Sequence, residues 1–131
     1  MKFLHEELTY KILEACFEVS KELGSGFLES IYQNALLIAL QDKGIKVISQ
    51  YPLRVVFRNQ DVGNYYADFF VEDKVILETK AVTALTPEHQ AQVINYLKAT
   101  GINVGLLVNF GKSKLEYKRL ERNPRVQVYE V

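Results

Sequence analysis

The spacing of apolar residues predicts two helices in the first third of the chain. Over residues 8–23 apolar side chains recur every three or four positions, as on one face of a helix. Gly24 and Gly26 then interrupt the pattern, because glycine suits both the end and the start of a helix. A second helix is expected over residues 27–42, closed by Gly44. Its apolar face, which we expect to be buried, holds Phe27, Leu28, Ile31, Ala35 and Ile38.

After Gly44 the apolar period changes to two, which is typical of β-strands. We expect a first strand over residues 45–57, with Pro52 as the place for a bend. A segment rich in turn formers at 59–64 should connect it to a second strand at 65–71. A tight polar turn at 72–74 then leads into a third strand at 75–82. The three strands are therefore contiguous along the chain.

The second half of the chain predicts a helix between two strands. Thr86 suits the N-cap, Pro87 the first helical position, and Glu88 the first turn, so a helix should run from there to Ala99. Residues 104–110 form a nearly all-apolar run, as in a strand covered on both faces. Such a strand–helix–strand unit predicts a right-handed parallel crossover. Weaker alternation near residues 115–120 and 126–131 leaves room for one or two edge strands.

Length and composition place the chain among ordinary globular proteins. With 131 residues, 48% of them hydrophobic, we expect a single α/β domain over residues 1–131. Its expected order is α-α-β-β-β-α-β-(β), with a mixed central sheet flanked by helices. The apolar runs are too short for a membrane span, and the acidic start does not resemble a signal peptide, so a cytoplasmic location is expected. The single cysteine, Cys16, excludes an internal disulfide and a cysteine-based zinc cluster.

Charge is balanced overall but unevenly distributed. Sixteen basic and sixteen acidic residues give a formal net charge of zero, so no global field attracts nucleic acid. Residues 111–125, however, hold six Lys and Arg against two Glu. This segment is the candidate substrate-binding patch, and a solvated surface explains it equally well. The members considered for binding are Lys112, Lys114, Lys118 and Arg119.

Charged residues interrupt two of the predicted strands. Glu78 and Lys80 point to the same face of the third strand, because side chains alternate along a strand. Asp68 interrupts the second strand, and the tight turn between the strands can place it beside Glu78. Two opposed carboxylates repel each other unless a cation lies between them, which favours a Mg²⁺ or Mn²⁺ site. A cross-strand salt bridge on a solvated face is the alternative.

Four motifs in order resemble a known group of nucleases. Asp68 followed by Glu78-Thr79-Lys80 is similar to the PD-(D/E)xK nuclease superfamily pattern, although Ala67 replaces the proline. Residues 26–32 read Gly-x-x-Glu-x-x-Tyr, which resembles the GxxExxY family of that superfamily. Residues 92–96 resemble the Gln-x-x-x-Tyr motif of RecB-like members. The resemblance covers nearly the whole chain and implies a restriction-endonuclease-like fold.

The resemblance implies a role for each matched residue. Asp68 and Glu78 would bind the metal, with the Thr79 carbonyl and Glu29 as further ligands, and Lys80 would orient or activate water. Gln92 and Tyr96 would face the active site, and Tyr32 is a weaker candidate for substrate contact. The alternative for Glu29 is the third position of its helix, where an acid interacts with the helix dipole. Packing against the sheet is an equal explanation for both tyrosines.

These features predict a Mg²⁺- or Mn²⁺-dependent nuclease. DNA is favoured over RNA by family analogy alone. The alternative is a catalytically inactive module that keeps the nuclease fold and binds nucleic acid or a protein partner through the basic segment. Because the basic surface is limited, a homodimer or a protein partner is also a candidate for completing substrate binding.

Overall fold

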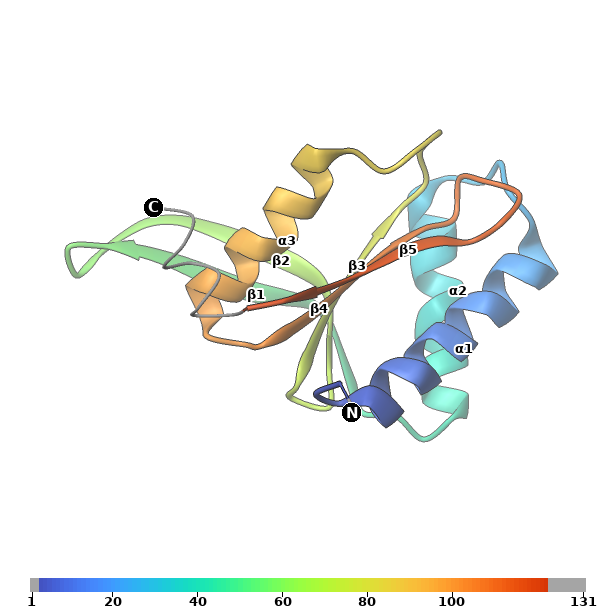
Figure 1. The fold of residues 1–131 in the computed structure, drawn as a ribbon, viewed down its shortest axis with the longest axis horizontal. Coiled ribbons are helices and arrows are strands. Elements are labelled where there is room, and N and C mark those ends of the chain that lie inside the picture. The colour runs from blue at the N-terminus through green and yellow to red at the C-terminus, as the bar shows by residue number, and fades with distance from the viewer. Residues whose placement is uncertain (1–2, 123–131) are drawn as a thin grey trace.

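The computed structural model describes residues 3–122 as a five-stranded sheet with three helices (Figure 1). The elements follow the predicted order. They are α1 (Glu6–Leu23), α2 (Glu29–Asp42), β1 (Val47–Phe57), β2 (Gln60–Val71), β3 (Val75–Lys80), α3 (Pro87–Thr100), β4 (Val104–Asn109) and β5 (Glu116–Glu121). Within the described residues, no helix is both long and apolar enough to cross a membrane.

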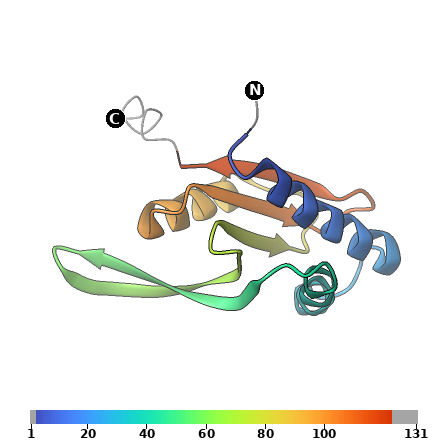
Figure 2. The same cartoon turned by 90° about the horizontal axis from the view of Figure 1, so that it is seen from below.

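The strands lie in sequence order across the sheet, from β1 to β5. Figure 2 shows this succession from the long β1–β2 hairpin in green to β5 in red. Strands β3 and β4 run parallel and are connected through α3, as the strand–helix–strand pattern predicts. The other neighbouring pairs are antiparallel. The mixed α/β sheet predicted from sequence is confirmed.

Helices cover both faces of the sheet. On one face α1 and α2 pack side chains such as Ile12 and Leu36 against Leu77 and Leu106. On the other face Tyr96 and Leu97 of α3 pack against a smaller cluster of buried residues, namely Leu53, Ala67, Phe70 and Ile76.

Gly105 of β4 allows α3 to approach, because a Cβ at this position would lie 2.7 Å from Val93 Cγ1. Strand β4 is buried along its whole length, as its apolar sequence predicts.

The prediction of which face of α2 is buried is wrong. The buried residues of this helix are Tyr32, Leu36 and Leu40, which lie four positions apart. Among the residues predicted to be buried, Phe27, Leu28, Ile31 and Ile38 are exposed. The apolar residues of α2 lie around much of its circumference, so periodicity alone could not identify the face that meets the sheet. The helix also begins at Glu29 with Leu28 as its N-cap, so Glu29 is the first helical residue and not the third.

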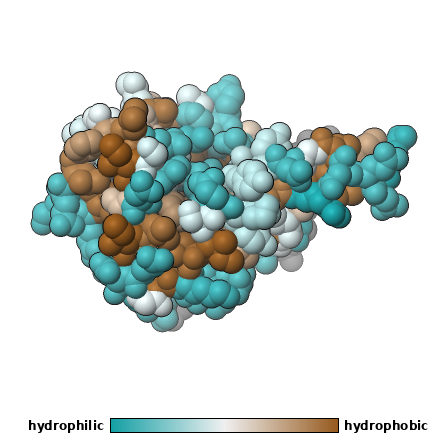
Figure 3. All heavy atoms as spheres, turned by 180° about the vertical axis from the view of Figure 1, so that it is seen from behind, coloured by the Kyte–Doolittle hydropathy of each residue, from teal (hydrophilic) through white to brown (hydrophobic). Residues whose placement is uncertain are grey.

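The β1–β2 hairpin is longer than predicted. Phe57 pairs with Gln60, so the turn consists of Arg58 and Asn59, both with positive φ, and not of residues 59–64. The strand continues through Pro52, which an edge strand tolerates because one side has no hydrogen-bonding neighbour. The register shift lies between Val55 and Val56. Figure 1 shows the hairpin projecting away from α1 and α2, and the space-filling view from behind in Figure 3 shows the same projection.

The remaining boundaries agree with prediction to within a few residues. Helix α3 has Thr86 as N-cap and Gly101, with a φ of 75°, as C-cap. Strand β3 ends at Lys80, two residues before the predicted end. One predicted edge strand is present as β5, and the second, near residues 126–131, lies outside the described residues.

Candidate active site

Asp68 and Glu78 lie beside each other where β2 and β3 stop pairing. The last backbone pair of the two strands is Phe69 with Leu77. Beyond it, the Asp68 amide donates to Glu78 Oε1 at 2.9 Å, and the Thr79 amide donates to Asp68 Oδ2 at 2.8 Å. Each carboxylate therefore accepts a main-chain hydrogen bond from the opposite strand. The adjacency predicted from strand alternation is confirmed.

The pair places negative charge in a largely buried environment. Glu78 is 4% exposed. Burial, and then the neighbouring charge of Asp68, raises the pKa of Glu78 to about 8. Desolvation also raises the pKa of Glu29, with a further contribution from Asp68, while Lys80 acts in the opposite direction. Without a cation, this arrangement disfavours the ionised form of Glu78.

A hydrogen-bond chain connects helix α2 to Asp68. Gln33 Nε2 donates to Glu29 Oε2 at 3.3 Å and to Thr79 Oγ1 at 3.1 Å. Thr79 Oγ1 in turn donates to Asp68 Oδ2 at 3.0 Å. Gln33 thus fixes the orientation of both Glu29 and Thr79. Gln33 was not among the site residues predicted from the motifs, although its position one turn after Glu29 places it on the same helix face.

Lys80 and helix α3 form the other side of the site. Lys80 follows Glu78 by two residues on β3, and its Nζ donates to Gln92 Oε1 at 3.4 Å. The end of the strand is held in place because the Phe110 amide donates to the Lys80 carbonyl at 2.8 Å. His89 caps α3: its Nδ1 accepts from the Thr86 amide at 3.0 Å. The structure therefore brings together Lys80 and Gln92, as the family resemblance implies.

Tyr96 packs against the β1–β2 hairpin, and the charges of both carboxylates act on its hydroxyl. It is 6% exposed, and its ring centroid is 5.6 Å from that of Tyr65. Burial, followed by the charges of Glu78 and Asp68, raises the pKa of Tyr96 to about 12. The hydroxyl therefore stays protonated at neutral pH and can act as a hydrogen-bond donor.

Tyr32 does not face the substrate side, contrary to its prediction as a substrate contact. It is fully buried, and its ring stacks on Phe110 with centroids 4.9 Å apart and planes 4° apart. Its hydroxyl donates to the Gly24 carbonyl at 2.5 Å and accepts from the Phe27 amide at 3.2 Å. Packing, the alternative explanation, is therefore correct. Tyr32 fixes the loop that leads into Glu29.

The basic segment separates into two faces of β5. Arg119 is engaged in intramolecular contacts: it donates to the Leu4 carbonyl and to Thr9 Oγ1, and it pairs with Glu121. The prediction that Arg119 binds substrate is wrong in this arrangement, because the guanidinium attaches the N-terminal residues to the sheet. Lys118 is exposed, and the register aligns it with Leu107 and Glu78 in one row across the sheet. Lys112 and Lys114 are exposed in the loop before β5.

The carboxylate pair provides suitable ligands for a small divalent cation. Mg²⁺ typically takes one or two carboxylates, with water and substrate phosphate completing its coordination. Asp68 and Glu78 supply two. The raised pKa of Glu78 reflects its burial first and the charge of Asp68 second, and a bound cation offsets both. Among residues 3–122 no three His, Cys, Asp or Glu side chains are grouped to hold a metal ion. In this arrangement Glu29 is not grouped with the pair, and its carboxylate accepts a hydrogen bond from Gln33. Its role as a metal ligand stays a prediction.

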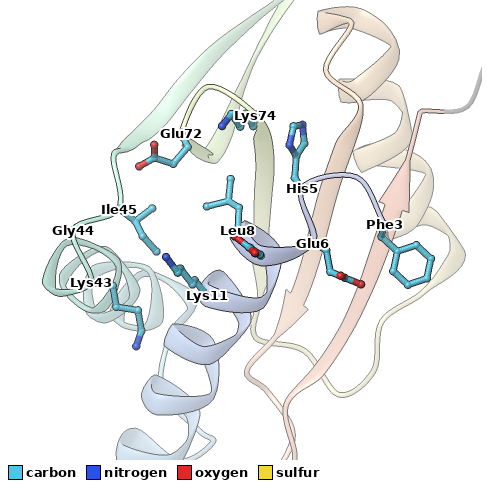
Figure 4. Close-up of a pocket in the computed structure, with 11 residues that line it drawn as sticks. Phe3, His5, Glu6, Leu8, Lys11, Lys43, Gly44, Ile45, Glu72 and Lys74 are labelled. Carbon is cyan, nitrogen blue, oxygen red and sulfur yellow. The ribbon is translucent and has the colours of Figure 1, made fainter. Parts of the chain in front are cut away.

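A separate cavity lies away from these residues. It has a volume of about 530 Å³ and is formed near the start of α1, the end of α2 and the β2–β3 turn. Figure 4 shows His5, Lys11, Lys43 and Lys74 around it together with acidic side chains. It contains none of the predicted site residues. Its mixed charges do not favour one class of ligand.

The fold and the site together define a nuclease-type α/β protein, with two acids and a lysine on neighbouring strands beside a crossover helix. The chain belongs to the PD-(D/E)XK nuclease superfamily, whose family model matches residues 6–120. Nucleases of this superfamily generally depend on divalent metals. The chain is thus assigned to a family of phosphodiester-cleaving enzymes.

Two solved structures share the fold. An alkaline exonuclease from Laribacter hongkongensis is 13% identical with a TM-score of 0.56, and the match covers 98% of this chain and 76% of that one. A protein described as SSO0001 is also 13% identical with a TM-score of 0.56, covering 96% of this chain and 64% of that one. At this identity the likeness supports the fold alone. No curated protein sequence matches the chain significantly.

Proposed function

We propose that this protein is a divalent-metal-dependent nuclease that hydrolyses phosphodiester bonds in DNA, with Mg²⁺ or Mn²⁺ as its metal. The observation that carries the proposal is the contact between Asp68 and buried Glu78, with Lys80 on the same face of the same strand. Family membership supplies the reaction class. Within the superfamily, the Gly26–Glu29–Tyr32 and Gln92–Tyr96 spacings favour kinship with the GxxExxY and RecB-like groups.

Each residue at the site has a task in this proposal. Asp68 and Glu78 hold the cation, and the Thr79 carbonyl is the proposed third ligand. The chemistry supplied at that position is Lewis-acid stabilisation of phosphate charge and a lower pKa for water. Lys80 orients the attacking water and offsets negative charge that develops on the phosphate. Glu29, held by Gln33, adds negative charge beside Asp68 without joining the pair.

Helix α3 assists from the other side. Gln92 accepts a hydrogen bond from Lys80, so it limits where the ammonium group can point. The protonated Tyr96 hydroxyl is a donor for the substrate phosphate. Exposed Lys118, Lys112 and Lys114 are the proposed contacts to the neighbouring phosphates of the strand.

Cleavage assays with matched variants test the proposal. Single-stranded DNA, duplex DNA and RNA are incubated with Mg²⁺, Mn²⁺ or chelator, using wild type, Lys80→Ala and Asp68→Asn. Lys74→Ala, an exposed lysine at the opposite end of β3, is the control. We expect metal-dependent cleavage that falls by about 10²–10⁴-fold in both site variants and is unchanged in the control.

Calorimetry with Mg²⁺ and Mn²⁺ completes the test. Wild type should bind the metal, and Asp68→Asn should bind it more weakly. Absence of both cleavage and metal binding in wild type would refute the enzymatic function. Nucleic-acid binding that depends on Lys118 and not on Lys80 would then identify the protein as a binding module.

A further inference from the structure

A groove of about 620 Å³ lies between the β1–β2 hairpin and helix α3. The hairpin contributes Leu53, Val55 and Tyr65 to its walls, and α3 contributes Gln92, Asn95 and Tyr96. Figure 1 shows α3 lying beside the hairpin that projects from the body of the protein. The volume is within the range of small-ligand sites.

The groove shares two residues, Gln92 and Tyr96, with the proposed active site. Gln92 lines the groove and accepts the hydrogen bond from Lys80. Tyr96 lines it as well, and the charges of Glu78 and Asp68 act on the Tyr96 hydroxyl. A group resting on Tyr65 therefore lies beside the Tyr96 ring, on whose hydroxyl the carboxylate charges act.

The lining suits a flat, weakly polar group more than a phosphate. Of its ten side chains only Glu88 and Lys98 are charged, and they have opposite signs. Leu53 and Val55 form an apolar wall, while the Tyr65 ring is 51% exposed and free to stack. Asn95 is exposed at the edge and offers both a hydrogen-bond donor and an acceptor. Aromatic stacking with an amide at the edge is how proteins bind unpaired nucleic-acid bases.

We infer that this groove binds one unpaired base of the substrate strand, next to the phosphate that is cleaved. The base stacks on Tyr65, and its edge hydrogen-bonds to Asn95. A base within a duplex cannot enter, because its faces are stacked and its edge is paired. The inference rests on the proposed function and gives it a substrate class: single-stranded nucleic acid, or an end at which the strands have separated.

The test compares two adjacent tyrosines of β2. Tyr65 lines the groove, whereas Tyr66 is 60% exposed and does not. Binding of a fluorescein-labelled single strand and of the blunt duplex of the same sequence is measured by anisotropy, with Ca²⁺ in place of the catalytic metal. Cleavage of both is measured with Mg²⁺ and Mn²⁺. The variants are Tyr65→Ala, Tyr65→Phe, Asn95→Ala and the control Tyr66→Ala.

We expect wild type to bind and cleave the single strand in preference to the duplex. Tyr65→Ala should weaken single-strand binding by about 5- to 150-fold, the loss that removal of one base–aromatic stack causes. Tyr65→Phe should retain binding because the ring is kept, and Tyr66→Ala should match wild type. An abasic position next to the cleaved phosphate should weaken wild type and leave Tyr65→Ala nearly unaffected. Asn95→Ala changes a side chain on the helix surface, so it tests whether the groove contributes to binding without removing a packed ring.

The outcomes separate the inference from the proposed function. The inference would be overturned if duplex and single strand were bound and cleaved equally, or if Tyr65→Ala and Tyr66→Ala had equal effects on binding. Metal-dependent cleavage would in that case still support a nuclease. Binding without cleavage would refute hydrolysis, and the two tyrosine variants would still decide whether the groove holds a base. If wild type neither binds nor cleaves any of the probes, both are overturned.

Discussion

Replacing Glu78 by glutamine should make the metal-free protein more stable in alkaline solution. The side chain is buried beside Asp68, and its pKa is raised to about 8 from an ordinary value of 4.5. Glutamine has nearly the same shape and keeps the oxygen that accepts the Asp68 amide. It never ionises, so the substitution removes the buried charge without removing the contact.

The sign and size of the stability change follow from the pKa of Glu78 in the folded and in the unfolded protein. Between pH 4.5 and about 8, folded Glu78 holds a proton that the unfolded chain has released. The free energy of unfolding is therefore highest at low pH and falls as the pH rises through this window. One pKa unit corresponds to about 1.4 kcal/mol, so the full loss approaches about 5 kcal/mol. Since small domains have about 5–15 kcal/mol in total, the effect is measurable.

Urea unfolding at several pH values between 5 and 9, with chelator present, measures the effect. Wild type and Glu78→Gln should have similar stability at pH 5, and the variant should be more stable by several kcal/mol, about 3–5, at pH 9. Glu22→Gln, at an exposed carboxylate on α1, is the control and should follow wild type. Added Mg²⁺ or Mn²⁺ should stabilise wild type at pH 8 and have much less effect on Glu78→Gln. A constant difference between wild type and Glu78→Gln across this pH range would show that the pKa of Glu78 is not raised by its surroundings.

Three further substitutions test the roles that we assign to Tyr32, Arg119 and Lys118. Tyr32→Phe keeps the ring stacked on Phe110 but removes both hydroxyl hydrogen bonds. Urea unfolding should therefore show a free energy of unfolding that is lower by about 1–3 kcal/mol. Unchanged stability would contradict the role assigned to the hydroxyl. Arg119→Ala should destabilise the fold by about 1–3 kcal/mol, because the side chain loses its contacts to the N-terminal residues. Lys118→Ala should leave stability unchanged and weaken DNA binding in anisotropy titrations. Equal effects of the two basic substitutions on stability would contradict the separation into two faces.

The core of the site could be predicted from sequence because it depends on local geometry. Strand alternation places Glu78 and Lys80 on one face, and a three-residue turn brings Asp68 opposite Glu78. The start of α3 was equally predictable, since Thr86 and Pro87 act through backbone effects within one turn. Each of these predictions required only neighbours in sequence or one tight hairpin.

Predictions failed where distant elements decide the outcome. The role of Tyr32 depends on Phe110, which reaches it from the end of β4. The intramolecular role of Arg119 depends on Leu4 and Thr9 at the opposite end of the chain. Likewise, the contact between Gln33 and Thr79 joins a helix to a strand. Periodicity carries no information on such pairings, because it describes one segment at a time.

The site and the end of the sheet are a single structural feature. Between β2 and β3, the Asp68 and Glu78 carboxylates accept the hydrogen bonds that main-chain carbonyls accept elsewhere in a ladder. The strands can therefore separate without leaving these amides unpaired, and the separation places both carboxylates beside Lys80 and Tyr96. Removing either acid by alanine would thus disturb the sheet as well as the chemistry. Isosteric changes such as Asp68→Asn and Glu78→Gln keep the acceptor oxygen, so a loss of activity in them reports on charge and metal binding and not on a collapsed strand end.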